Sequence, residues 1–266
     1  AIALDAGLPD AAPGRALPSD HAQGLREWPE AGVTQIALGP WRASVTINDI
    51  PSTAKRGGHP SGGSLAMLWH ERAGPLLVAS LNDYLRYEGV NMDEAHADTD
   101  KTVLTPRLEA HLDGCLYSSV HEGRAELAST QDGESIHLIA HGVLRDVHGQ
   151  APPDGSTAYE LQYRFTPDAF VLTARCASPA VLHVPLVAPA SASLVASDAG
   201  VFTLHLPEAR VRLVASAAPV APVAMSATER VFNYVPGVQA APFRFDLTPD
   251  LAVEVRLEVS PHSDAA

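Results

Sequence analysis

Apolar and polar residues alternate along much of the chain from residue 28 onward. The clearest example is 251–259, where Leu, Val, Val, Leu and Val are separated by Ala, Glu, Arg and Glu. Residues 159–165 and 243–247 alternate in the same way. A period of two places one row of side chains in a core and the other in water, so each of these segments predicts a half-buried β-strand.

Other apolar runs predict further strands. They cover residues 33–38, 42–47, 64–69, 76–80, 125–129, 135–144, 169–176, 181–187, 201–206, 210–215 and 231–235. Turn-forming pairs such as Asp-Gly at 113–114 and 132–133 separate several of them. The Ala/Pro-rich stretch 215–224 is interpreted as a loop or an edge strand. Many short strands with little helix favour an all-β fold, a large antiparallel sandwich of two sheets.

Composition limits the number of domains and the class of partner. The chain has 266 residues, 46% of them apolar, which is enough for one large core. We expect one sandwich domain over residues 27–266, after an arm or linker over 1–26 that is rich in Ala, Pro, Gly and Asp. No apolar run approaches the roughly 20 residues of a membrane helix. The net charge of −13 disfavours nucleic acid as a partner, but a local basic patch could still bind an acidic polysaccharide.

The two cysteines and the N-terminal residues bear on disulfide bonding and on export of the protein. Cys115 and Cys176 are too few for a disulfide scaffold, so two buried thiols are the simpler interpretation, with one bridge left open. The chain begins at Ala1 without the basic and apolar regions of an export signal, which predicts a processed or cloned product.

Two polar segments are candidates for a binding or catalytic site. Residues 55–64 hold four glycines, the cations Lys55 and Arg56, and His59. Glycines let a ligand approach the backbone closely, and a histidine can relay a proton. The segment is not a phosphate-binding loop, because it lacks the spacing from glycine to Lys-Ser/Thr and leads into a predicted strand. A solvated surface loop is the alternative interpretation.

The second polar segment begins at Ser80 and contains Tyr84, Arg86 and Asn91. An aromatic face can stack on a sugar ring, and a guanidinium can pair with a carboxylate or sulfate. These residues therefore favour sugar recognition, whereas packing of Tyr84 into the core is the alternative.

Metal and hydrolase sites are not indicated. His137 and His141, four apart in a predicted strand, would lie on one face about 13 Å apart. The other histidines are scattered, and no compact cluster supplies the three or four ligands that zinc takes. We expect no cofactor, with a divalent metal such as zinc or calcium left open. The chain also lacks a Gly-x-Ser-x-Gly motif after a strand.

Four short motifs resemble the β-sandwich part of the heparinase II/III-like polysaccharide lyases. They are residues 28–33 (WPEAGV), 39–42 (GPWR), 59–65 (HPSGGSL) and 74–78 (GPLLV). The resemblance implies that a helical toroid domain of the same parent chain precedes the sandwich, and that an acidic polysaccharide is cleaved between the two by β-elimination. In that reaction a Tyr or His removes the C5 proton of a uronic acid and protonates the leaving oxygen, while the carboxylate is neutralised.

Four functional positions of the family's motif are occupied here by Gly57, His59, Ser61 and Ala79, so only one histidine is retained. We therefore take His59 as the candidate catalytic residue. The candidate substrate-binding residues are Lys55, Arg56, Tyr84, Arg86 and Asn91. The resemblance also implies a secreted or periplasmic location. Two alternatives stay open, a non-catalytic carbohydrate-binding or structural sandwich and a stand-alone sugar enzyme of the mutarotase-like sandwich shape.

Overall fold

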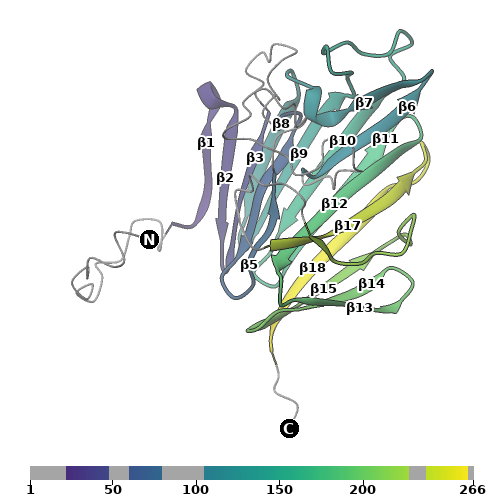
Figure 1. The fold of residues 1–266 in the computed structure, drawn as a ribbon. Helices are drawn as coiled ribbons and strands as arrows, with labels where there is room; N and C mark the ends of the chain where they lie inside the picture. The colour runs from purple at the N-terminus through teal and green to yellow at the C-terminus, as the bar shows by residue number, and fades with distance from the viewer. Residues whose placement is uncertain (1–21, 48–59, 80–104, 228–237, 263–266) are drawn as a thin grey trace, which may run out of the picture.

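The computed structural model describes residues 22–47, 60–79, 105–227 and 238–262 of the chain (Figure 1). Nearly all regular structure in these ranges is β-strand, and every strand pair is antiparallel. The first sheet has five strands in chain order, β1 (Gly24–Trp28), β2 (Val33–Leu38), β3 (Trp41–Thr46), β4 (Ser64–His70) and β5 (Gly74–Val78). A short 3-10 helix, η2 (Pro29–Ala31), joins its first two strands.

The other strands form an eight-stranded and a second five-stranded sheet. The eight-stranded sheet has the order β13 (Ser193–Asp198), β14 (Val201–His205), β15 (Ala209–Ala215), β18 (Val253–Pro261), β11 (Ala169–Cys176), β10 (Ala158–Phe165), β9 (Ser135–Val143) and β8 (Glu126–Asp132). The second five-stranded sheet has the order β16 (Ser226–Ala227), β17 (Val238–Leu247), β12 (Ala180–Pro189), β6 (Arg107–Leu112) and β7 (Cys115–Ser118). A 3-10 helix, η3 (Ser119–His121), follows β7.

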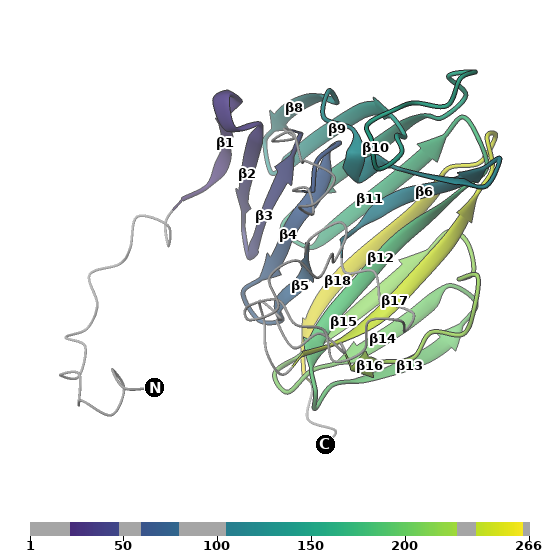
Figure 2. The same ribbon diagram turned by 45° about the horizontal axis from the view of Figure 1, so that its top comes forward.

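The two five-stranded sheets lie side by side and form one layer of a sandwich, with the edge strand β5 next to the part of β12 that β6 does not pair. Strands β5 and β12 are in contact, and Val78 packs against Val187 and Ala240 across that junction. The eight-stranded sheet forms the opposite layer (Figures 1 and 2). One apolar core fills the space between the layers, with Trp41 and Phe243 among its fully buried side chains.

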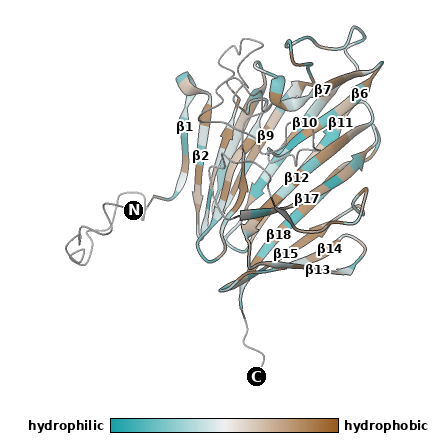
Figure 3. Cartoon of the chain, viewed as in Figure 1, coloured by the Kyte–Doolittle hydropathy of each residue, from teal (hydrophilic) through white to brown (hydrophobic). Residues whose placement is uncertain are grey.

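Alternation along the strands follows the sequence pattern. On β18, Val253, Val255 and Leu257 are fully buried, and the residues between them face outward. Figure 3 shows the resulting alternation of hydrophobic and hydrophilic residues along the strands. The prediction of an all-β antiparallel sandwich is confirmed, and β2 and β11 have the predicted bounds.

Five of the described strands were not predicted, and four of them, β1, β7, β13 and β16, lie at sheet edges. In β1, β7 and β13 few residues are buried, so the alternation of apolar side chains is weak. Strand β6 is an inner strand that places Leu108 and Ala110 in the core and Leu112 against it, and this short alternation with Arg107, Glu109 and His111 was missed. Strand β1 begins at Gly24, so the sheet includes the last residues of the range suggested as an arm. The predicted strand 231–235 lies outside the described residues.

The cysteine prediction is half wrong. Both thiols are free, and Cys176 is buried as expected. Cys115 is exposed because it begins β7, the last strand at one edge of its sheet. The stretch 215–224 is a loop after β15, consistent with one of the two interpretations.

Candidate functional site

The candidate site residues from the sequence all lie outside the described residues. These residues are Lys55, Arg56, His59, Tyr84, Arg86 and Asn91, which fall in ranges 48–59 and 80–104. The acidic residues Asp93, Glu94, Asp98 and Asp100 also lie in the second of these ranges. The structure does describe the chain that directly follows His59, from Pro60 into β4, and that chain is firmly held.

Two buried tyrosines of β10 hold the glycine pair that follows His59. The Tyr159 hydroxyl donates to the carbonyl oxygen of Gly62 at 2.7 Å, and the Tyr163 hydroxyl donates to that of Gly63 at 2.6 Å. Burial raises the pKa of both phenols above the ordinary value, so they stay protonated and keep donating. The start of β4 is thereby bonded to the opposite layer of the sandwich.

Close packing explains why glycines occupy these two positions. Gly62 and Gly63 have φ values of 67° and 78°, in the left-handed region. A Cβ on Gly62 would lie 1.9 Å from the carbonyl oxygen of Ser119, and one on Gly63 would lie 2.2 Å from the Cβ of Ala140. In this half of the segment the glycines serve packing, whereas the sequence alone suggested close approach of a ligand.

Glu122 completes the anchor beneath Ser61. The carboxylate of Glu122 is buried and accepts from Arg145 Nε at 2.8 Å and from the backbone N–H of Arg124 at 2.7 Å. Its main-chain carbonyl accepts from the Ser61 hydroxyl at 2.9 Å. The family-like motif is therefore rooted in a network of buried polar groups, which fixes the point where chain 48–59 joins β4.

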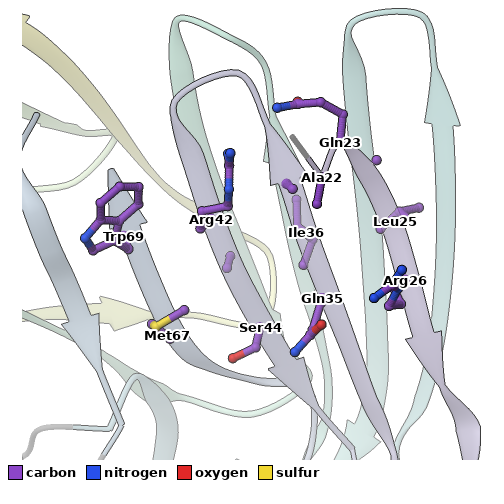
Figure 4. Close-up of a pocket in the computed structure, with 13 residues that line it drawn as sticks. Ala22, Gln23, Leu25, Arg26, Gln35, Ile36, Arg42, Ser44, Met67 and Trp69 are labelled. Carbon is purple, nitrogen blue, oxygen red and sulfur yellow. The ribbon is translucent and has the colours of Figure 1, made fainter. Parts of the chain in front are cut away.

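A groove of about 700 Å³ opens on the outer face of the first sheet (Figure 4). Its lining residues are Ala22, Gln23, Gly24, Leu25, Arg26, Gln35, Ile36, Ala37, Arg42, Ala43, Ser44, Met67 and Trp69. Strand register places Arg26 opposite Gln35, Gln35 opposite Ser44, and Ser44 opposite Met67. These four residues thus form a row across β1 to β4, and Figure 4 shows them side by side.

A second row of the groove holds Arg42 and Trp69, which are register partners on β3 and β4. Arg42 Nη1 donates to the carbonyl oxygens of Gly39 and Trp41, each at 2.8 Å. These bonds orient the guanidinium and use only one of its nitrogens. Among the described residues, no partner binds the remaining N–H groups of Arg42.

The groove is locally basic in an acidic chain. Strands β1 to β5 contain two arginines, Arg26 and Arg42, and one carboxylate, Glu27. Glu27 does not face the groove, because its carboxylate accepts from the Ser129 hydroxyl of β8 in the opposite layer. The outer face of this sheet therefore presents positive charge and aromatic surface together, although the whole chain has a net charge of −13.

The second five-stranded sheet carries a buried ionic cluster on its outer face. Glu109 binds Arg107 Nε at 2.6 Å and His183 Nε2 at 3.0 Å. Burial alone would raise the pKa of Glu109, but the hydrogen bond from His183 and the charge of Arg107 outweigh it and hold the pKa at about 2. His183 thus has a hydrogen-bond partner in Glu109.

Metal ligation has no support in the part of the chain that the structure describes. Within it, no group of three or more His, Cys, Asp or Glu side chains could hold an ion. His137 and His141 lie exposed along the outer side of β9, on one face as predicted. His59, the histidine retained from the family's motif, lies outside the described residues.

Known structures share this architecture. Heparinase III superposes with a TM-score of 0.53 at 11% identity, over 92% of this chain and 37% of that one. The same protein with methylated lysines gives a TM-score of 0.51 at 11% identity, over 94% and 37%. These matches show the fold alone, a β-sandwich that corresponds to 37% of the longer heparinase III chain.

The sequence comparison identifies the family. The Ulvan lyase C-terminal domain family matches residues 25–260, and the chain belongs to that family. A relative, the broad-specificity ulvan lyase of Formosa agariphila, is 24% identical over 240 residues, which cover 88% of this chain and 37% of the relative. The chain thus spans little more than a third of that relative's length. Within the described ranges, no helix is long and apolar enough to cross a membrane.

The groove residues Arg26, Arg42 and Trp69 were missed by reasoning from sequence. Arg42 lies between inward-facing Trp41 and Ala43, so its outward position could have been read from alternation. Arg42 lies beside Trp69 only because β3 pairs with β4, and local sequence does not reveal that pairing.

Proposed function

We propose that this chain is the β-sandwich part of a polysaccharide lyase that cleaves an acidic polysaccharide by β-elimination. The match of residues 25–260 to the ulvan lyase C-terminal family carries this proposal. A helical toroid domain of a longer parent chain would supply the other wall of the cleft, since the sandwich corresponds to 37% of a whole ulvan lyase. The residues before Gly24 would then link the two domains, and the sandwich domain would begin with β1.

The proposed reaction needs a base, a neutraliser of the substrate carboxylate and a proton for the leaving oxygen. The base takes the C5 proton of a uronate, and the electron pair passes through an enolate-like intermediate to form the double bond between C4 and C5. The bond from C4 to the leaving oxygen breaks, and that oxygen receives a proton. A cation close to the carboxylate lowers the barrier, because negative charge grows there in the transition state.

His59 is the residue proposed closest to this chemistry. Its neighbour in sequence, Pro60, begins the segment that Tyr159, Tyr163 and Glu122 fix to the opposite layer. The chain that follows His59 is thus held in place, and this supports the proposal of His59 as a positioned acid or base. Proposed substrate contacts come from Lys55, Arg56, Tyr84, Arg86 and Asn91. A secreted or periplasmic location is part of the same proposal, because a large polysaccharide is met outside the cell.

The test is the absorbance of unsaturated uronate near the ultraviolet edge. The full-length parent and the 266-residue chain are each incubated with ulvan and with other acidic polysaccharides. We expect signal from the parent and little or none from the chain alone, since half the cleft is missing. In the parent, His59→Ala should reduce the signal strongly, whereas His137→Ala, an exposed histidine of β9, should not.

Other results would contradict parts of the proposal. Full activity of the isolated chain would show that the sandwich needs no second domain. If the parent produced no unsaturated uronate from any acidic polysaccharide, a non-catalytic carbohydrate-binding sandwich would explain the chain better.

A further inference from the structure

We propose that the groove on the outer face of β1 to β5 is a binding subsite for anionic units of a polysaccharide. The subsite is formed by Arg26, Arg42 and Trp69 and is distinct from the candidate residues in 48–59 and 80–104. This inference rests on the proposed function only for the identity of the ligand as an acidic polysaccharide. Its geometry comes entirely from described strands.

Arg42 provides the anchor for a carboxylate or sulfate group. Its bonds to the carbonyls of Gly39 and Trp41 hold the guanidinium in place without neutralising it. The free edge of an oriented guanidinium can donate two parallel hydrogen bonds to a planar carboxylate or to two sulfate oxygens. Because the side chain is held before binding, little conformational entropy is lost when the anion arrives.

Trp69 is placed to contact the sugar ring next to that anion. It is the register partner of Arg42, so the two side chains project from adjacent strands about 4.8 Å apart. The indole is partly exposed and lines the groove together with Met67, which is 40% exposed. An aromatic face beside a cation suits a charged pyranose, which has apolar C–H surfaces as well as its anionic group.

The row from Arg26 to Met67 gives the subsite its length. Three strand spacings of about 4.8 Å separate these residues, so the row runs roughly 14 Å and exceeds one sugar ring. Gln35 and Ser44, between them, offer hydrogen-bonding groups for hydroxyls. Arg26 lies 5.8 Å from the ring centroid of Trp28, an arrangement that restrains a second cation at the outer strand.

Charge favours a polyanion over a second protein domain at this surface. The chain has 31 acidic and 18 basic residues, yet the only carboxylate in these five strands points to the other layer. Arg, Trp and Met are also common at protein interfaces, so the choice of a polyanion rests on the excess of positive charge in the groove. The polar side chains of Ser44 and Gln35 between the cations suit the hydroxyls of a sugar.

The test is equilibrium binding of the 266-residue chain to polymers of defined charge, measured by calorimetry or affinity electrophoresis. Polygalacturonate carries carboxylates only, dextran sulfate carries sulfates only, and dextran is neutral. We expect binding to one or both charged polymers but not to dextran, and weaker binding as salt rises. The charged polymer that binds more tightly identifies the anionic group.

Variants then assign the binding to the groove. Arg42→Ala should weaken binding about ten- to a hundredfold, as expected for loss of a charge-assisted pair. Trp69→Ala should weaken it about two- to tenfold. Arg164→Ala is the matched control, because Arg164 is an exposed arginine on β10 in the opposite layer and its loss changes net charge equally. This control should bind like wild type, and thermal unfolding should confirm that every variant is folded.

Unchanged binding in both groove variants would overturn the subsite, as would equal weakening by Arg164→Ala, which would indicate only a net-charge effect. The subsite would also be overturned if the groove variants bound polymer normally but no longer associated with the proposed helical toroid domain. That result would identify the groove as a docking face for the toroid domain. The lyase proposal fails separately, because it depends on double-bond formation by the parent. Polymer binding through the groove without lyase activity would leave the subsite standing alone.

Discussion

Replacing Gly62 by alanine tests the claim that buried packing, rather than ligand approach, fixes the start of β4. Its φ of 67° costs a residue with a Cβ about 1–2 kcal/mol. The new Cβ would also lie 1.9 Å from the Ser119 carbonyl oxygen, and backbone shifts that relieve such overpacking cost about 1–3 kcal/mol. Disturbing the hydrogen bond from the Tyr159 hydroxyl adds about 1 kcal/mol. We expect a total destabilisation of about 3–6 kcal/mol.

Urea unfolding followed by circular dichroism measures this loss, and Gly114→Ala is the control. Gly114 has a φ of 80°, but nothing lies within 4 Å of an added Cβ, so this variant should lose only about 1–2 kcal/mol. If Gly62→Ala does not fold, Tyr159→Phe offers a milder test, with an expected loss of about 1 kcal/mol. Equal losses in the two glycine variants would refute the packing argument.

Three further predictions concern titration and thiol access. Because folding lowers the pKa of Glu109 from 4.5 to about 2, its contribution of about 3 kcal/mol is present above pH 4.5 and is lost as pH falls towards 2. Urea midpoints should show this acid-range loss, and Glu109→Gln should remove it. Burial lowers the pKa of His70 from 6.5 to about 4. Between these values the unfolded chain binds a proton that the folded chain does not, so the free energy of unfolding should fall as pH is lowered from 6.5 to about 4. His70→Asn keeps an acceptor for the N–H of Arg72 and should remove the change of stability with pH in this range. An unchanged dependence on pH would show that His70 is not its source. A thiol reagent should label Cys115 in the native chain and Cys176 only after unfolding, whereas rapid labelling of both would contradict the buried position of Cys176.

Period-two alternation predicted the fold class because it reports which face of each strand is buried. Strand β18 is the clearest case, since Val253, Val255 and Leu257 are buried and alternate with outward residues within the predicted segment 251–259. The same signal does not say which strands pair. The division of one layer into two sheets meeting at β5 and β12 therefore could not be read from the sequence.

The site was less predictable for a related reason. Arg42 and Trp69 become neighbours only when β3 pairs with β4 across the segment 47–63. Glu109 and His183 come from strands more distant still, so neither looked like part of an ionic cluster. Residue types that stand out locally, such as His59 in its glycine-rich segment, were found from sequence, and their role stays a proposal.

The most direct test of the central claim compares two products of the full-length parent acting on ulvan. Each bond cut by β-elimination yields one new reducing end and one unsaturated uronate, whereas each bond cut by hydrolysis yields a reducing end alone. We predict that double bonds and reducing ends rise together in a one-to-one ratio. Reducing ends without double bonds, or neither product, would contradict the assignment of this sandwich to a polysaccharide lyase.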